Sequence, residues 1–236
     1  MIVIVASRWD AAAAAYASRC AAHDVRILTA RDLSLAGWRQ YLHWAEGETA
    51  MIDGQVVPQQ QITGVLTLVR GVSVEEPVEI VPRDRAYVAA EMTAFLLFWL
   101  SRLTCPILNR PTPACLSGPD WRPEKWVRTA FQAGIPAVPV HRLAAFGNLR
   151  APEEAAAGVV DVTVVGPRTF GEVDPCLHRC ARQLAAMAGV ELAQFRFSSP
   201  QGGGRFMGAS TFPGLTEDWL ADAALEYLRG GVAAPA

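Results

Sequence analysis

The chain opens with an alternation of strand and helix patterns. The apolar run MIVIVAS at 1–7 predicts a strand buried on both faces, as in a parallel sheet. The alanine-rich segment 11–22 predicts a helix with Asp10 as its N-cap, and VRILTA at 25–30 predicts a second strand. This order indicates an α/β domain with a right-handed crossover. The segment 6–9 carries no glycine where a dinucleotide-binding turn needs it, so we expect no Rossmann-type cofactor site.

The next eighty residues predict further strands around one long helix. Asp53-Gly54 predicts a hairpin turn, and ITGVLTLVRG predicts another buried strand. The stretch 86–103 is barely the ~20 apolar residues that a membrane span needs, and it carries Glu91 and Arg102. The pattern therefore favours a helix over 84–103 that is buried on most sides. CPILNRP then predicts a short strand ended by prolines.

The second half predicts shorter helices and antiparallel hairpins. Gly134 and Gly189 are typical helix-ending residues. The predicted elements are a helix over 124–133, the extended segment IPAVPVHRL, a loop over 145–158, a hairpin over 161–173, a helix over 175–188, two strands within 191–210 and a helix over 220–228.

Composition narrows the classes of protein. Hydrophobic residues make up 51% of the 236 residues and charged residues 19%, which excludes general disorder. The formal net charge is −2 and no Lys/Arg-rich run occurs, so we expect no nucleic-acid partner. Five cysteines form an odd set without tight spacing, and the N-terminus does not have the pattern of a signal sequence. We therefore predict a cytoplasmic protein that does not bind membranes.

Two short motifs suggest ligands but fit structural roles better. On a helix Cys176 and Cys180 share a face while His178 points away, whereas zinc needs four convergent ligands. The run 201–205, QGGGR, has the glycines of a phosphate loop, but a strand pattern follows it, which favours a hairpin turn.

Two other arrangements stay open. Cys105 or Cys115 with His141 is a conceivable nucleophile–base pair without a positional motif. A cleft for a peptide carboxylate at the carboxyl edge of the sheet is also possible, although salt-bridged surface charges are the favoured interpretation. The charged residues concerned are Arg70, Arg83, Arg85 and Glu91.

Three stretches in order carry a resemblance. The first is CPILNRPT, then Glu124-Lys125-Trp126 and a helix ending in AGIPAVP; the second is VTVVGPRTFG; the third is AAMAGVELAQFRFSSPQGGGRFMGASTFPG. Together they resemble an ATP-grasp protein of the peptide-ligase type, related to the ribosomal-protein glutamate ligases. In that family an Asn-x-Pro follows a strand, a helix carries an invariant lysine, and a Gly-x-Pro follows the helix. Asn109, Lys125, Gly134 and Pro136 occupy those places.

The resemblance implies an α/β fold in two parts. We expect a pre-ATP-grasp-like domain with a parallel sheet over 1–110, and a reduced ATP-grasp-like α+β domain over 111–236.

Several positions depart from the family pattern. Where the family carries magnesium-holding carboxylates and an asparagine on its last strands, this chain has Arg196, Gly208 and Ser210. A nucleotide-binding subdomain needs roughly 45 residues, but only the short interval 140–165 is available for it. The family's second phosphate-holding lysine has no counterpart, because Lys125 is the sole lysine in the sequence. Phosphoryl transfer without metal or phosphate clamp loses most of its electrostatic stabilisation.

We therefore predict a degenerate, non-catalytic ATP-grasp-like protein that needs no cofactor. It would be a binding or scaffolding subunit of a peptide-modification or small-molecule biosynthetic complex, working as a homodimer or beside an enzyme or peptide substrate. The alternative is an ATP-dependent carboxylate–amine ligase whose ATP and magnesium site is completed by a partner chain. A third possibility is a small enzyme that uses the cleft without ATP. We expect no metal ligands and no catalytic residues, and the candidate ligand-binding residues are Lys125, Arg196, Asn109 and Ser210.

Two finer expectations concern the old metal site and its surroundings. Arg196 should meet Glu172, Asp174 or Glu91, because a buried guanidinium needs an anionic partner, or else it should clamp a ligand carboxylate or phosphate. A fold without its lid should also expose apolar cleft walls. The candidates for these walls are Trp99, Trp121, Trp126, Phe206 and Trp219.

Overall fold

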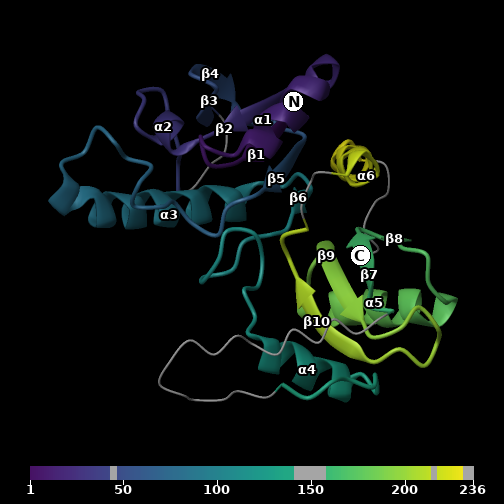
Figure 1. Ribbon diagram of the computed structural model, residues 1–236. Coiled ribbons are helices and arrows are strands. Elements are labelled where there is room, and N and C mark those ends of the chain that lie inside the picture. Colours follow the sequence, from purple (N-terminus) through teal and green to yellow (C-terminus); the bar gives the residue numbers. More distant parts are fainter. Residues whose placement is uncertain (43–46, 141–157, 214–216, 231–236) are drawn as a thin grey trace. The chain divides into compact units, whose positions relative to one another are not determined.

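The computed structural model describes residues 1–42, 47–140, 158–213 and 217–230. Contacts divide the chain into two compact units (Figure 1). The first unit comprises Met1–Asp120 together with Gly214–Ala236, and the second unit is Trp121–Pro213.

A four-stranded parallel sheet with the order β2-β1-β5-β6 forms the centre of the first unit. Its strands are β1 (Ile2–Val5), β2 (Val25–Leu28), β5 (Gly64–Thr67) and β6 (Ile107–Leu108). A separate hairpin consists of β3 (Thr49–Ile52) and β4 (Gln55–Pro58), and the helices are α1 (Ala11–Arg19), α2 (Ala30–Leu33), α3 (Arg85–Arg102) and α6 (Asp218–Leu228). The predicted opening strand, helix and strand are confirmed, and Asp10 caps α1 by accepting a hydrogen bond from the Ala13 N–H.

Helices cover both faces of this sheet. On one face Val3, Val5 and Val65 pack with Trp99 and Leu100 of α3. On the other face lie α1 and α6, which are joined where the buried Tyr16 hydroxyl donates to the Ala221 carbonyl oxygen over 2.9 Å.

A glycine lets α6 approach the sheet closely. A Cβ added at Gly64 of β5 would lie 2.7 Å from the Leu228 carbonyl oxygen and 2.8 Å from the Leu228 Cβ. Only glycine allows this approach without a shift of the helix. The helix predicted near 220–228 therefore belongs to the first unit rather than to a domain over 111–236, and the first unit runs on to Asp120 rather than 110.

The helix α3 differs from the expected burial. Ala89, Leu96, Trp99 and Leu100 are buried, but Tyr87 in the first turn is 69% exposed. A helix of 18 residues is about 27 Å long, whereas a strand of 4 residues reaches about 13 Å, so the helix extends beyond the sheet that covers it. Within the described residues, no helix has the length and apolar character of a membrane span.

The second unit is an antiparallel sheet with two helices against one face. The strand order is β10-β9-β7-β8, with β7 (Val160–Val165), β8 (Arg168–Phe170), β9 (Leu192–Phe197) and β10 (Phe206–Ser210). The helices α4 (Pro123–Gln132) and α5 (Pro175–Ala188) bury Trp126, Leu177 and Leu184 against Phe195 and Phe197 of the sheet. Gly189 ends α5 in the left-handed conformation with φ 64°, as predicted.

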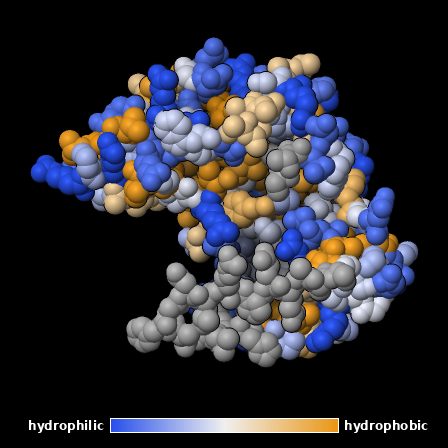
Figure 2. All heavy atoms as spheres, viewed as in Figure 1, coloured by the Kyte–Doolittle hydropathy of each residue, from blue (hydrophilic) through white to orange (hydrophobic). Residues whose placement is uncertain are grey.

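The fold class is therefore α/β, with a parallel sheet followed by an antiparallel one, as predicted. The expected hairpin over 161–173 is β7 and β8, and the strands expected within 191–210 are β9 and β10. The predicted loop over 145–158 falls almost entirely outside the described residues. Apolar residues come to the surface in several patches among hydrophilic ones (Figure 2).

Candidate functional site

The face of the antiparallel sheet opposite the helices is built by alternation along β7 and β9, and a β-bulge between Phe206 and Gly208 brings β10 into the same pattern. Val162 and Phe195 point into the core under α4 and α5. Their sequence neighbours point the other way, because successive side chains on a strand face opposite sides. The face opposite the helices carries two polar rows in register: Asp161, Arg196 and Gly208 form one row, and Thr163, Gln194 and Ser210 form the other. The first row is accessible to solvent, whereas Thr163 of the second row is buried.

The first row contains a two-pronged ion pair. The Arg196 Nε donates to Asp161 Oδ1 over 3.0 Å, and its Nη2 donates to Asp161 Oδ2 over 3.3 Å. Hydrogen bonding to Asp161 and the negative charge of its carboxylate raise the pKa of the Arg196 guanidinium. The Arg196 side chain is 56% exposed and that of Asp161 is 32% exposed.

The expected burial of Arg196 and its expected partners were therefore wrong, although the expectation of an internal carboxylate was correct. Asp161 lies directly opposite Arg196 in the strand register, a cross-strand position that brings two side chains within contact distance. Gly208 lies opposite Arg196 on the other side, just after a β-bulge in β10, and an added Cβ there would meet nothing within 4 Å.

The other candidate residues of the second unit lie on different elements. Ser210, at the end of β10, is exposed, and its hydroxyl accepts a hydrogen bond from the Phe212 N–H. Lys125 is on α4, where its ammonium lies 3.9 Å from the centroid of the Trp121 ring. This contact is a cation–π interaction on an exposed helix face. The structure thus brings Arg196 and Ser210 to one sheet face, while Lys125 is on a helix that packs against the opposite face.

Asn109 belongs to the first unit and is 1% exposed. Its amide donates to the Ser117 carbonyl oxygen over 3.3 Å, and a Cβ at Gly118 would lie 2.9 Å from the Asn109 Cβ. The side chain therefore holds the loop that follows β6. Ligand binding by Asn109 stays a prediction.

The aromatic residues expected on cleft walls divide between core and surface. Trp99, Trp126 and Phe206 are fully buried in the cores of their units, so they do not line an open cleft. Trp121 is partly buried against the second core, and Trp219 is 42% exposed.

Burial disfavours activation of four of the thiols. Desolvation by burial raises the pKa of each of four cysteines, Cys20, Cys105, Cys115 and Cys180. A raised pKa lowers the thiolate fraction at neutral pH. His141, the base considered for Cys105 or Cys115, lies outside the described residues.

At the carboxyl edge of the parallel sheet, the arginines considered from the sequence are engaged locally. Arg70 pairs with Asp120 over 3.2 Å, Arg83 pairs with its neighbour Asp84, and Arg85 donates to backbone carbonyls of the preceding loop. A different trio marks this edge, and sequence reasoning missed it.

That trio is Ser7, Arg8 and Glu76. The Ser7 hydroxyl donates a short hydrogen bond to one carboxylate oxygen of Glu76, and the Arg8 Nε donates to the other over 3.1 Å. The Arg8 Nη2 also donates to the Glu76 carbonyl oxygen over 2.6 Å. These contacts attach the loop after β5 to the end of β1. The sequence signal was the polar pair directly after the first buried strand, where a parallel sheet presents its ligand-binding edge.

The fold of the chain is similar to that of solved structures of macrocyclases and of ATP-grasp ligases. The macrocyclase MdnC of Microcystis aeruginosa MRC, bound with the precursor peptide MdnA, is 10% identical; the match covers 97% of this chain and 99% of that chain, with a TM-score of 0.65. The macrocyclase MdnB of the same organism is 12% identical; the match covers 96% of this chain and 98% of that chain, also with a TM-score of 0.65. The third structure is a RiPP-associated ATP-grasp ligase of Chryseobacterium gregarium in complex with ADP and a leader and core peptide. It is 10% identical, the match covers 99% of this chain and 97% of that chain, and the TM-score is 0.61.

The chain has an ATP-grasp-ligase-like fold. At these identities the likeness extends to the fold alone. No protein-family profile matches the sequence, and no curated protein matches it.

The residues on the face of this ATP-grasp-like sheet opposite the helices do not fit a magnesium ion. Magnesium takes hard oxygen ligands, usually including a carboxylate that is available to it. The Asp161 carboxylate is held by a guanidinium on both oxygens, and its row continues to Gly208, which has no side chain. The neighbouring row of Thr163, Gln194 and Ser210 contains no carboxylate. Across the part of the chain that the structure describes, no group of three or more His, Cys, Asp or Glu side chains could hold a metal ion.

Proposed function

We propose that this chain is a non-catalytic ATP-grasp-like protein that acts as a binding or scaffolding subunit in a peptide-modification or small-molecule biosynthetic complex. It carries out no ligation of its own, and it works in the cytoplasm as a homodimer or beside an enzyme or peptide substrate.

The observation that carries the proposal is the Arg196–Asp161 pair. If the strands correspond to those of the family, Arg196 stands where a ligase presents a magnesium-holding carboxylate. A guanidinium at that place inverts the local charge. It also donates hydrogen bonds to both oxygens of the Asp161 carboxylate, so neither oxygen is available to a metal ion. Electrostatic stabilisation of the transferring phosphoryl group is the main catalytic contribution in such reactions, so its loss argues against catalysis.

The peptide part of the proposal is supported by the structures that share the fold. Two of the three just described hold a precursor or a leader and core peptide. The binding of a peptide requires neither a metal nor a nucleotide, so it is the part of such an activity that this chain can retain.

The first test is Mg-ATP binding by the isolated protein. A ligand at a hundredfold excess over its Kd stabilises the folded state by about 2.7 kcal/mol, or roughly 5–10 °C in melting temperature for a chain of this length. We expect no magnesium-dependent shift with millimolar ATP. A clear shift would overturn the proposal.

The second test separates the scaffold from the alternative ligase. The protein is purified from its native host with its partner, and Mg-ATP binding is measured again on the complex. A scaffold leaves ATP affinity equal to that of the partner alone. If the complex binds Mg-ATP and the partner alone does not, the chain is instead a ligase whose nucleotide site is completed by a partner chain.

A further inference from the structure

The parallel sheet of the first unit has a topological switch point. In the order β2-β1-β5-β6, the chain leaves β1 toward α1 on one face, and it leaves β5 toward α3 on the other face. A crevice opens where neighbouring connections diverge in this way, outside the carboxyl ends of the strands. Ser7 follows β1 at this crevice, and the loop that contains Glu76 follows β5.

Two hollows meet at this edge. One has a volume of about 500 Å³ and the other about 300 Å³, and Ser7 and Thr29 line both. Ile27 lines the larger hollow and its neighbour Leu28 lines the smaller one, so the hollows lie on opposite faces of the sheet. Their sizes fall within the range of small-molecule sites.

The smaller hollow is apolar. Val5, Val69, Val72 and Leu96 contribute to its walls. Both charged side chains of its lining are engaged, Glu76 by Ser7 and Arg8, and Arg70 by Asp120, so no unpaired charge demands a polar ligand there. Such a space fits an aliphatic or aromatic side chain.

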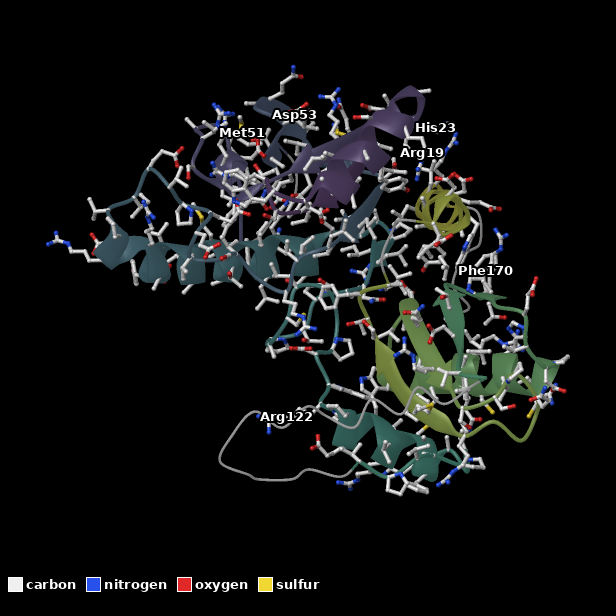
Figure 3. The ribbon with its side chains drawn as sticks, viewed as in Figure 1. Arg19, His23, Met51, Asp53, Arg122 and Phe170 are labelled. Atoms are coloured by element: carbon white, nitrogen blue, oxygen red, sulfur yellow. The ribbon has the colours of Figure 1, made fainter. Side chains whose placement is uncertain are left out.

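The larger hollow carries charges of both signs. Both Asp32 carboxylate oxygens are engaged, one by the Gly54 N–H and the other by Thr29. Arg31 and Asp53 also line this hollow. Both are exposed, and within the described residues neither side chain makes a hydrogen bond or ion pair. Asp53 lies in the turn between β3 and β4 (Figure 3).

We propose that this edge binds a zwitterion with an apolar side chain, either a free amino acid or a short peptide. The ligand carboxylate pairs with Arg31, its ammonium pairs with Asp53, and its side chain passes Ser7 and Thr29 into the smaller hollow. This site lies wholly within the first unit, goes beyond the function proposed above and does not depend on it.

Calorimetry with four probes tests the ligand chemistry at neutral pH. The probes are L-leucine, the dipeptide Leu-Leu, L-leucinamide and N-acetyl-L-leucine. We expect leucine or the dipeptide to bind, and the tighter of the two identifies the source of the zwitterion. Leucinamide lacks the carboxylate and N-acetyl-leucine lacks the ammonium, so each should bind at least about tenfold more weakly than leucine. Failure of all four probes to bind at millimolar concentration, or equal binding of leucine and its two blocked forms, overturns the proposal.

Variants locate the site. Val72→Trp fills the smaller hollow and should abolish binding, while Val74→Trp, an exposed position on the same loop, should not. Arg31→Ala and Asp53→Asn should each weaken binding about tenfold or more, and asparagine tolerates the positive φ of position 53. Binding unchanged by Val72→Trp and Arg31→Ala would place the ligand elsewhere and refute the site. The Mg-ATP and partner experiments do not involve these residues, so either proposal can fail alone.

Discussion

The buried carboxylate of Glu76 gives a sharp test of how the first unit is held together. Its side chain is 5% exposed and that of Arg8 is 22% exposed, so the ion pair between them is largely removed from water. The substitution Glu76→Gln keeps the size of the side chain but removes its charge. The amide retains one acceptor oxygen for two former donors, the Ser7 hydroxyl and the Arg8 Nε. The bond from Arg8 to the Glu76 backbone carbonyl is unaffected.

These contacts set a range for the loss in free energy of unfolding that Glu76→Gln should cause. A hydrogen bond to a charged group contributes about 1.5–3 kcal/mol, and leaving a charge unpaired in a buried place costs more. Because the remaining exposure of Arg8 lets water reach its guanidinium, the lower half of that range applies. We expect Glu76→Gln to reduce the free energy of unfolding by about 2 kcal/mol, or roughly 4–8 °C in melting temperature for a chain of this length.

Urea denaturation and hydrogen exchange together measure this effect. The midpoint should fall with an unchanged slope, and amides of the loop over 69–81 should exchange faster, since Glu76 fixes this loop to β1. Glu75→Gln is the matched control, because that neighbouring side chain is exposed and its carboxylate has no partner among the described residues. A difference between the two variants below about 0.5 kcal/mol would refute the assigned burial and role of the Arg8–Glu76 pair.

Three further measurements check other parts of the structure. Gly64→Ala should lower the free energy of unfolding by about 1–3 kcal/mol because the added methyl group pushes α6 away from β5, whereas Gly208→Ala, where a Cβ meets no atom, should lower it by less than about 1 kcal/mol. Equal losses for the two variants in urea denaturation would contradict the close approach of α6 to β5. Burial raises the folded-state pKa of four thiols and of the Tyr16 hydroxyl, so the stability of the folded state should be intact below about pH 9 and should fall as the pH rises and the unfolded chain ionises more readily. A melting temperature that is constant from about pH 8 to about pH 10.5 would contradict the raised pKa values. Arg196→Met should change stability by less than about 1 kcal/mol, because the pair with Asp161 is exposed, and it should leave partner affinity unchanged; loss of partner binding in a folded variant would make Arg196 a ligand clamp instead.

Local sequence signals predicted most of the elements. Four consecutive apolar residues in β1 read as a doubly covered strand, and both faces are covered. Asp10 and Gly189 act at helix ends as their side-chain chemistry and φ preference require. These features depend on neighbours along the chain, so the pattern of residue types was sufficient to predict them.

Long-range packing was less accessible. The residue pattern of α6 does not indicate which surface the helix packs against. Its position depends on the missing Cβ of Gly64, which lies more than a hundred and fifty residues earlier in the sequence. The partner of Arg196 depended on the register between β7 and β9, which sets Asp161 opposite it and cannot be read from either strand alone. The length of α3 was predictable from its apolar run, but its exposure was not. That exposure depends on how far the neighbouring strands extend, and the strand β6 pairs with β5 over only a few residues.

The return of α6 to the first unit has a consequence for biosynthesis. Trp121–Pro213 is contiguous and can be synthesised and released as one segment, whereas the first unit needs residues from both ends of the sequence. While the ribosome is still translating the second unit, the face of β5 beside Gly64 stays uncovered and the Tyr16 hydroxyl lacks its acceptor on Ala221. The unit that begins first is therefore the one that is completed last. Over that interval its parallel sheet is exposed to chaperones and to incorrect pairing, although the order of elements in the sequence suggests the opposite.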